Sequence, residues 1–441
     1  MLVSDCSSLL YLLIAMSVLC SSPAGWLLDE LLLVNKWYQH GGGLCTQGEQ
    51  DRLATTYCFR EDLFLILKPY IATPSPVISD AKCEPARSES LELSISGPEN
   101  KKPERKKRPR SKSLNSGEVD ALLYHKKISD LILVGSQSLI NDGFEKGFLQ
   151  PLAGKEDEKS EVESNLNNKT CGLAELCDMA KNMPTLNLAE LDVRVLNDGN
   201  SVSQDTDFLS HITENPSDWP QCINLLAETY LIPPKSSFLL SDITCIQPLL
   251  KYKKYNIIVI DPPWENKSVK RSKSYSYLSP GQMKQLPIPG LADTECLVVT
   301  WVTNRQKHLR FIKEELYPHW SVRTLAEWHW VKITKSGELV FPLDSQHKKP
   351  YEILVLGRLQ KPDSATFSDD LPPIPPHKLI VSVPCKLHSH KPPLSEILKE
   401  YVKPDAQCLE LFARNLQPGW TSWGNEVLKF QHLDYFIPTQ T

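Results

Sequence analysis

The chain has 441 residues, 41% of them hydrophobic and 23% charged, and a formal net charge of −4. This length suits one large domain with a second unit. The nearly balanced charge excludes binding to nucleic acid through total charge alone, so any such surface must come from local clusters of Lys and Arg. The 12 cysteines include no C-x-x-C pair, which excludes zinc-ribbon spacing. We expect no metal site and a reducing compartment.

Residues 1–84 show no clear pattern and are predicted to be a poorly defined N-terminal region. Within them, Leu9 to Cys20 is an apolar run that resembles the core of a secretory signal peptide. No Lys or Arg precedes this run, it is too short to span a bilayer, and Met16 inside it is a second candidate start. We therefore expect no membrane association and treat secretion as the less favoured alternative. The stretch Trp26 to Val34 predicts a short apolar helix.

Residues 85–116 are predicted to be a disordered linker. The segment is rich in Ser, Pro, Glu and Lys and has too few apolar residues to bury a core. Within it, Lys101 to Lys112 (KKPERKKRPRSK) carries eight basic residues and one acid. Such a run is either a solvated stretch of charge or a segment that directs nuclear import or contacts nucleic acid, and we favour a functional role. We expect the protein in the nucleus, with the cytoplasm as a second compartment.

Residues 117–232 are predicted to be a helical accessory region that carries no chemistry of its own. Its longest helical pattern, from Gly117 to Leu152, places apolar residues on one face at spacings of three and four: Tyr124, Ile128, Leu131 and Ile132. Shorter helices are predicted at Leu173 to Met183 and at Asn224 to Leu231. A polar, acidic linker, residues 153–170, separates the first helix from the second.

After residue 241 the pattern changes to short apolar runs that are typical of strands. These runs are Tyr255 to Ile260, Cys296 to Val302, Leu325 to Val331, Tyr351 to Leu356, Leu379 to Val383 and Cys408 to Phe412. Helical stretches lie between several of them, such as Arg305 to Tyr317 and Leu394 to Val402. Buried strands that alternate with helices predict an α/β domain over residues 241–436, built on a mostly parallel sheet. Ligands of such sheets bind at the carboxyl ends of the strands.

The tetrapeptide Asp261-Pro262-Pro263-Trp264 directly follows the first of these strands. Asp261 places an acceptor at the strand tip. The prolines fix φ and remove backbone donors, which leaves the Pro262 carbonyl as a second acceptor. Trp264 offers a flat face for a base. These groups suit the exocyclic amine of adenine, because the acceptors would orient its weakly nucleophilic nitrogen and stabilise the positive charge that grows during methyl transfer. The alternative is a structural turn that ends the strand.

Five segments of this half carry a wider pattern: IIVIDPPWENKSVKR, LVVTWVTNRQKHLRFIKEELYP, AEWHWVKI, LHSHKPPL and LELFARNLQPGWTSWGNEV. Together they resemble the MT-A70-like family of adenine amino-methyltransferases, which includes the messenger-RNA adenosine methylase. The resemblance implies a Rossmann-like, S-adenosyl-L-methionine-dependent methyltransferase domain with a permuted motif order. In this order the catalytic tetrapeptide precedes the methionine-binding strand, here Leu409 to Phe412. The absence of an N-terminal G-x-G-x-x-G motif is therefore no objection.

The resemblance also implies a set of cofactor-binding residues: Asp242, Ile243, Lys391, Arg414, Asn415, Asn425 and Glu426. The first two would hold the adenine of the cofactor, and the lysine would contact its methionine carboxylate. The arginine and the asparagine beside it would reach the ribose region. The last two would bind the ribose hydroxyls or the adenine edge. Taken singly, several of these residues have structural alternatives, as a helix cap, a turn residue or a solvated charge.

The loop Asn266 to Tyr277 is basic and ends with two aromatic residues. Its nucleic-acid-binding candidates are four cations that suit phosphates and two rings that suit a base: Lys267, Lys270, Arg271, Lys273, Tyr275 and Tyr277. The alternative is a flexible, solvated lid. A neighbouring strand ends in three residues predicted to line the same pocket: Trp301, Asn304 and Arg305. Trp328 and Trp330, in contrast, are predicted to belong to the core.

The leading functional hypothesis is methyl transfer to the N6 amine of adenosine in RNA. The resemblance implies 2′-O-methyladenosine of U2 small nuclear RNA as the substrate, and activity without an obligate partner subunit. Adenine methylation of DNA is the alternative reaction, because the same base and amine are presented in both nucleic acids. An alternative of another class is a non-catalytic RNA-binding subunit, which the intact tetrapeptide disfavours.

Overall fold

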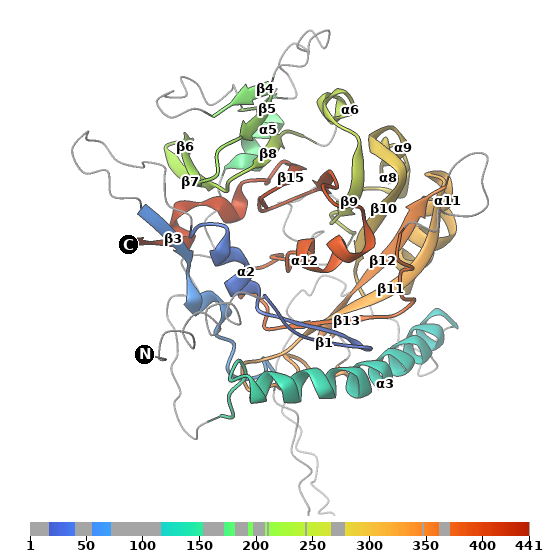
Figure 1. Ribbon diagram of the computed structural model, residues 1–441. Coiled ribbons are helices and arrows are strands. Elements are labelled where there is room, and N and C mark those ends of the chain that lie inside the picture. Colours follow the sequence, from blue (N-terminus) through green and yellow to red (C-terminus); the bar gives the residue numbers. More distant parts are fainter. Residues whose placement is uncertain are drawn as a thin grey trace, which may run out of the picture.

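The computed structural model has a 12-stranded mixed sheet at its centre, with helices against both faces (Figure 1). This architecture confirms the predicted α/β class and is consistent with a Rossmann-like methyltransferase fold. The structure describes residues 17–39, 55–71, 116–152, 172–180, 193–196, 208–209, 211–242, 245–265, 278–345, 348–360 and 371–440.

The strands of the central sheet come from both ends of the chain. Their order across the sheet is β1 (Val18–Ser22), β2 (Gly25–Leu28), β13 (Leu379–Ser382), β11 (Val322–Lys332), β12 (Tyr351–Leu359), β10 (Ala292–Val302), β9 (Tyr255–Ile260), β14 (Cys408–Leu411), β15 (Trp420–Gly424), β8 (Ser236–Leu240), β5 (Ile212–Asn215) and β4 (Val193–Val195). Seven neighbouring pairs are parallel and four are antiparallel. The sheet is therefore mostly parallel, as predicted, and all six predicted strands are present.

Alternation along the strands divides the core into two layers. In β9, Ile258 and Ile260 face one layer, whereas Ile257 and Val259 face the other. This period of two is what a strand buried on both sides requires. The first layer packs against α3, α6 and α8 to α11, and the second packs against α12. Because both faces are covered, functional groups reach solvent only at the edges formed by the strand ends.

The helices are short except for α3. They are α2 (Glu30–Lys36), α3 (Ser116–Glu145), α5 (Leu173–Ala180), α6 (Gln247–Tyr252), α8 (Pro280–Lys284), α9 (Ile288–Leu291), α10 (Gln306–Arg310), the π-helix η3 (Phe311–Leu316), α11 (Tyr317–His319) and α12 (Ser395–Leu398), with 3₁₀ turns η1 (Glu61–Phe64), η4 (Lys399–Tyr401), η5 (Lys429–Gln431) and η6 (Leu433–Tyr435). The predicted helices that begin at Leu173, Arg305 and Leu394 are thereby confirmed. Within the described ranges, no helix is both long and apolar enough to cross a bilayer.

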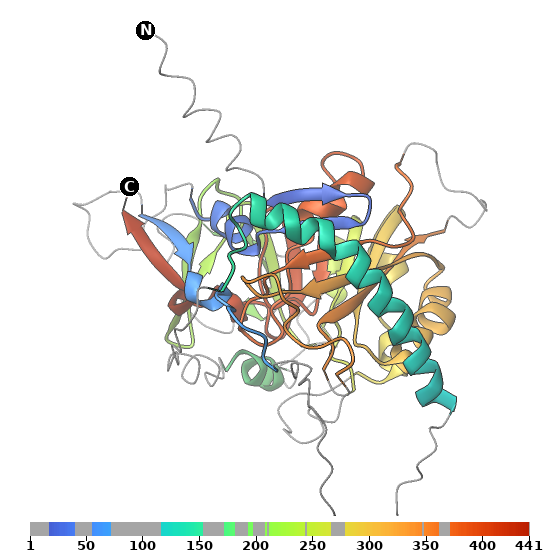
Figure 2. The same ribbon diagram turned by 90° about the horizontal axis from the view of Figure 1, so that it is seen from below.

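Helix α3 lies across the sheet beside β1, β2 and β13 (Figure 2). Its 30 residues make it about 45 Å long. The predicted face is the buried one: Ile128 and Ile132 are 3% and 0% exposed. A polar contact adds to this packing, because Tyr124 Oη donates to Glu327 Oε1 at 2.5 Å. Burial opposes ionisation of Glu327, but hydrogen bonds from His329, Lys313 and Tyr124 lower its pKa to about 2.

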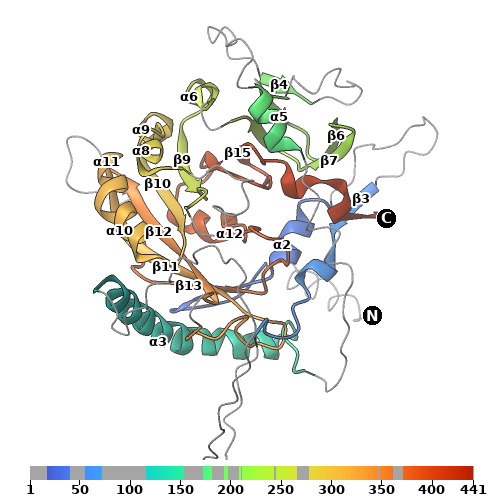
Figure 3. The ribbon, with the colours of Figure 1, turned by 180° about the vertical axis from the view of Figure 1, so that it is seen from behind.

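Several predictions for the first half were wrong in type. The stretch predicted as one helix from Trp26 contains strand β2 before α2. The predicted helix at Asn224 to Leu231 is a hairpin of β6 (Gln221–Leu225) and β7 (Glu228–Ile232). This hairpin lies beside a second small sheet of β3 (Thr55–Phe59) and β16 (Phe436–Gln440) (Figure 3). Because β4 and β5 also lie within residues 117–232, the accessory region is not helical throughout. Together with β8 they join the central sheet, which therefore crosses the predicted domain boundary at residue 241.

Candidate active site

Five parallel strands end at one edge of the sheet and bring the candidate residues together. Strands β8, β15, β14, β9 and β10 are parallel neighbours, so the residues that follow them share the edge where α/β proteins bind ligands. Asp261 follows β9, Arg414 follows β14 and Glu426 follows β15. The neighbouring strand β12 is antiparallel to β10, so its beginning, with Glu352, lies at the same edge.

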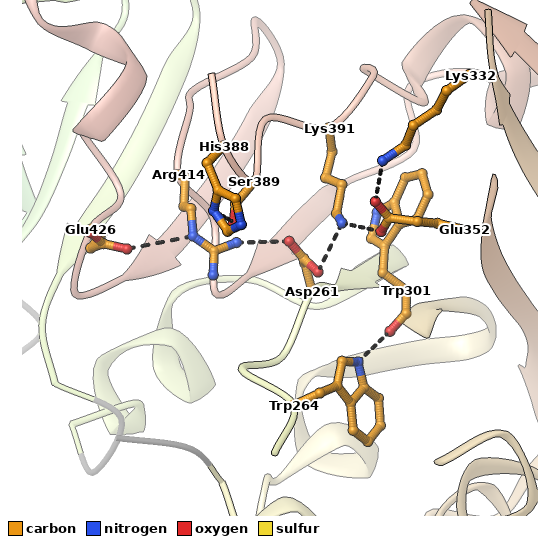
Figure 4. Close-up of polar contacts among 10 residues, drawn as sticks. All are labelled: Asp261, Trp264, Trp301, Lys332, Glu352, His388, Ser389, Lys391, Arg414 and Glu426. Atoms are coloured by element: carbon orange, nitrogen blue, oxygen red, sulfur yellow. Dashed lines mark hydrogen bonds and ion pairs between the residues drawn. The ribbon is translucent and has the colours of Figure 1, made fainter. Parts of the chain in front are cut away.

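The carboxylate of Asp261 lies between two cations (Figure 4). Arg414 Nη1 donates to Asp261 Oδ2 at 2.8 Å, and Lys391 Nζ lies 3.7 Å from Oδ1. The Asp261 side chain is only 11% exposed, and its backbone N–H donates to the carbonyl of Leu411. Charge-assisted contacts of this kind fix a carboxylate in position. The structure therefore holds the candidate catalytic acceptor at the strand tip.

These contacts continue in both directions as a chain of alternating charges. Glu352 binds Lys391 and Lys332 at 2.5 Å each, and on the other side Arg414 Nε lies 3.5 Å from Glu426 Oε2. Burial opposes ionisation of Glu352, but the positive charges of its two lysines outweigh it and lower its pKa. For Lys391, burial works against the charge, yet Asp261 and Glu352 raise its pKa. The site is thus assembled as ions that neutralise one another.

Another buried acid lies beside this row of ion pairs, but its pKa is raised rather than lowered. Glu410, on β14, is 6% exposed and accepts a hydrogen bond from Gln417 Nε2 at 3.1 Å. Burial, and then the negative charge of Asp261, raise the pKa of Glu410 to about 7. The neighbouring cations are too weakly coupled to it to reverse the shift. A buried glutamate that titrates near neutrality beside the catalytic candidate is a group to test.

A strained turn aims Arg414 at Asp261. Phe412, directly after β14, has a φ of +61°, a conformation that aromatic residues rarely adopt. The next backbone N–H, of Ala413, donates to the carbonyl of Trp423 at 3.0 Å. An added Cβ at Gly424 would lie 2.8 Å from the Ala413 carbonyl oxygen, so this close approach requires glycine. Strain of this kind is retained where the surrounding structure fixes a functional residue.

The other four cofactor candidates are Asp242, Ile243, Asn415 and Asn425, three of which lie in the described residues. Asp242 is buried after β8 and Asn425 follows β15, and the two strand ends are joined where Trp423 Nε1 donates to Ser241 Oγ at 2.7 Å. Ile243 lies outside the described residues. Asn415 is buried behind Arg414, near Glu410 and Lys391. With Lys391 and Glu426, six of the seven predicted cofactor residues therefore lie along one edge, and their roles stay predictions.

Trp264 lies beside Asp261 with its ring turned towards a cavity. Its Nε1 donates to the backbone carbonyl of Trp301 at 2.9 Å, and its ring centroid is 4.7 Å from that of His308. The ring of Trp301 is 1% exposed in the second core layer, below Lys391. The predicted contact of this ring with nucleic acid does not fit that position. Asn304 and Arg305, in contrast, do line the cavity with Trp264.

The predicted nucleic-acid loop, residues 266–277, lies outside the described residues, and so does the basic run Lys101 to Lys112. The roles assigned to both therefore stay predictions. Trp328 and Trp330 are confirmed as core residues, at 0% and 1% exposure. Seven cysteines in the described ranges are free, whereas Cys222 is disulfide-bonded. Within the described ranges, no cluster of His, Cys, Asp and Glu could hold a metal ion.

Sequence reasoning missed Lys332, Glu352 and Glu410. Glu410 stands in β14, whose other residues are apolar (CLEL), whereas Lys332 ends β11 and Glu352 is the second residue of β12. An acid in a strand buried on both faces is costly unless it is paired or protonated. The charged residues in these strands were visible in the sequence. Most of the residues that pair with them are remote along the chain, so the sequence alone does not show that they belong to the site.

Residues 255–426 match the model of the MT-A70 family. The human N(6)-adenine-specific methyltransferase METTL4 is 49% identical, over 97% of this chain and all of the human protein. The N6-methyladenosine RNA methyltransferase MTA1 of Pyricularia oryzae is 35% identical over 48% of this chain and 58% of its own length. The DNA N6-methyl methyltransferase of Caenorhabditis elegans is 33% identical over 52% of this chain and 65% of its own length.

Proposed function

This chain belongs to the MT-A70 family, and on that premise we propose that it transfers a methyl group to the N6 amine of adenine in nucleic acid. The observation that carries the proposal is the placement of Asp261 at the tip of β9, fixed between Lys391 and Arg414. The tetrapeptide that begins there lies inside the matched region. A relative named as an N(6)-adenine-specific methyltransferase aligns along its whole length.

The chemistry asked of these residues is orientation of a weak nucleophile. Asp261 and the Pro262 carbonyl would accept the two N–H groups of the amine and stabilise the positive charge that develops on its nitrogen. Arg414 already holds one carboxylate oxygen, Oδ2, so Oδ1, which lies 3.7 Å from Lys391, is the oxygen better placed for the amine. Because the carboxylate is fixed beforehand, little reorganisation is needed at the moment of transfer.

The residues at this edge fit S-adenosyl-L-methionine, which supplies the electrophilic methyl group when bound. The buried carboxylates of Asp242 and Glu426 suit an adenine amine and a ribose diol, and Lys391 suits a carboxylate. A polar set that is buried at the carboxyl ends of parallel strands is chemically matched to such a cofactor. Asp242, Lys391, Arg414, Asn415, Asn425 and Glu426 are the residues that would hold it.

For the substrate, we favour adenosine in RNA, and among RNAs 2′-O-methyladenosine of U2 small nuclear RNA. The related MTA1 protein is named as an RNA enzyme, which supports this choice. The nematode relative is named as a DNA enzyme, so DNA is the alternative substrate. A non-catalytic RNA-binding role is the alternative of another class. The proposal includes activity without an obligate partner subunit.

The decisive experiment measures methyl transfer from labelled S-adenosyl-L-methionine to matched RNA and DNA oligonucleotides. The expected result is transfer to the adenine N6 position, with RNA preferred. Asp261→Ala should abolish transfer, while an exposed aspartate supplies the control: Asp218→Ala, whose side chain is 80% exposed, should retain full activity. Full activity in Asp261→Ala, with an unchanged unfolding midpoint, would refute the proposed mechanism.

The proposed compartment is the nucleus, with the cytoplasm as a second one. The basic run Lys101 to Lys112 carries this expectation. Replacing its basic residues with Ala should shift a tagged protein towards the cytoplasm. An unchanged nuclear signal would assign the run to another role.

A further inference from the structure

A cavity of about 760 Å³ lies beside Trp264. Its walls come from α8, α10, the π-helix η3 and the first turns of α3, which contributes Ala121. Neither Asp261 nor Lys391 nor Arg414 is among the described residues that line it. The cavity therefore adjoins the catalytic candidate without containing it.

Two buried polar atoms in this wall lack partners within the described part of the chain. They are Asn304 Oδ1, an acceptor, and Gln306 Nε2, a donor. The orientation of Asn304 is fixed, because its Nδ2 donates to the carbonyl of Tyr351 at 2.6 Å. An unsatisfied buried polar group is costly, and such groups are rare unless a ligand or water pairs with them. One acceptor and one donor in the same wall are the two kinds of polar group that can pair with the edge of a nucleobase.

The remainder of the wall has an aromatic part and a charged part. Trp264, His308 and Phe311 are each 8% exposed and form the aromatic part. Burial lowers the pKa of His308, so its ring is neutral at neutral pH. The charged part holds both signs: Glu314 and Glu315, the second of which pairs with Lys284 at 2.9 Å, and the cations Arg305, Lys307 and Arg310. The aromatic part therefore suits a base, and the cations of the wall, such as Arg305, suit its phosphate.

The target base is not the occupant that fits best, because transfer requires its amine at Asp261. Trp264 lies three residues further along the chain, at most about 11 Å away, so a neighbouring nucleotide is within reach. Enzymes that flip out a target base commonly contact the nucleotides on either side of it. We propose that the cavity binds the base of the nucleotide adjacent to the target adenosine, packed on Trp264, His308 and Phe311 and hydrogen-bonded by Asn304 Oδ1 and Gln306 Nε2. The inference rests on the proposed function.

The test uses the full chain and an oligonucleotide that the wild-type protein methylates. Two further oligonucleotides keep every phosphate but lack the base on the 5′ or the 3′ side of the target. Loss of a stacked base is worth about 1–3 kcal/mol, so kcat/KM should fall by about 5- to 150-fold for one of the two and little for the other. Equal activity on all three oligonucleotides would overturn the inference.

A variant links the effect to the cavity. Gln306→Ala should lower kcat/KM on the intact oligonucleotide by about 3- to 10-fold and cause no further loss on the sensitive abasic one, because the same contact is already absent. The matched control is Gln360→Ala, exposed beyond the far end of β12, which should behave as wild type. Cofactor affinity should be unchanged in both variants. Equal losses on intact and abasic substrates would contradict a base contact at Gln306.

The outcomes separate this inference from the proposed function. No transfer to any adenine-containing oligonucleotide would refute the proposed function and the cavity assignment with it. Normal transfer with no abasic effect would refute the cavity assignment alone.

Discussion

The raised pKa of Glu410 makes a quantitative prediction about stability. The ordinary value of 4.5 rises to about 7 in the folded protein. Since one pKa unit corresponds to about 1.4 kcal/mol, ionising this buried group costs the folded state roughly 3 kcal/mol. Because the pKa is raised in the folded state, the stability that protonated Glu410 contributes is fully present below about pH 4.5. This contribution is lost as the pH rises to about 7.

Glu410→Gln removes the titration and retains a side chain that can still pair with Gln417. The variant should match wild type at pH 4.5 and exceed its free energy of unfolding by roughly 3 kcal/mol above pH 8. Urea unfolding of both proteins from pH 5 to pH 9 measures this difference. Glu30, 2% exposed, has a pKa raised by burial to about 8. The difference in unfolding free energy between Glu30→Gln and wild type should therefore level off about one pH unit higher than the difference for Glu410→Gln. A gap between Glu410→Gln and wild type that is the same at pH 5 and pH 9 would refute the reasoning.

Three further predictions concern the ion pairs of Glu352, helix α3 and the basic loop Asn266 to Tyr277. Glu352→Gln should lower the free energy of unfolding by about 2 kcal/mol, because Lys332 and Lys391 lose their shared partner; a stability equal to wild type in denaturant titration would contradict this. Leu139→Ala, 0% exposed, should cost about 2–5 kcal/mol, whereas Leu133→Ala, 54% exposed on the same helix, should change the unfolding free energy by less than about 0.5 kcal/mol. Removing Lys270 and Arg271 should weaken nucleic-acid binding on every sequence and reduce the slope of log affinity against log salt concentration by about one per contact. Tyr275→Ala should instead cost about 1–3 kcal/mol of binding free energy without changing that slope. Affinities measured over a salt series distinguish the two roles, with cofactor affinity as the control.

The strands of the second half were predictable because their signal is local. Each is a short apolar run bounded by polar residues, and the tetrapeptide at the end of β9 could be located from sequence alone. The resemblance then supplied residues such as Lys391 and Glu426, which spacing alone does not connect. The structure adds the ion pairs that join them through Asp261.

The hairpin β6–β7 shows why other elements were missed. Its turn residues, Leu226 and Ala227, have φ values of 54° and 60°, the conformation that Asn-Gly normally supplies in a two-residue hairpin. Leucine and alanine are helix formers, so the sequence at this turn favours the wrong structure. The strand β2 was missed for a different reason. Its partner strand β13, which begins at Leu379, is remote in sequence, so no local pattern indicates the pairing.

The assembly of one sheet from both ends of the chain has a consequence for how the protein is made. Gly25 of β2 pairs with Leu379 of β13, so at synthesis rates of about 5–20 residues per second β2 waits on the order of 20–70 s for its partner. Contacts this distant in sequence also slow folding. A fragment that begins at residue 241 would lack both β2 and β8, which leaves β13 and β15 as bare edges. Such edges pair with other chains, so we expect the isolated catalytic half to aggregate where the full chain stays monodisperse.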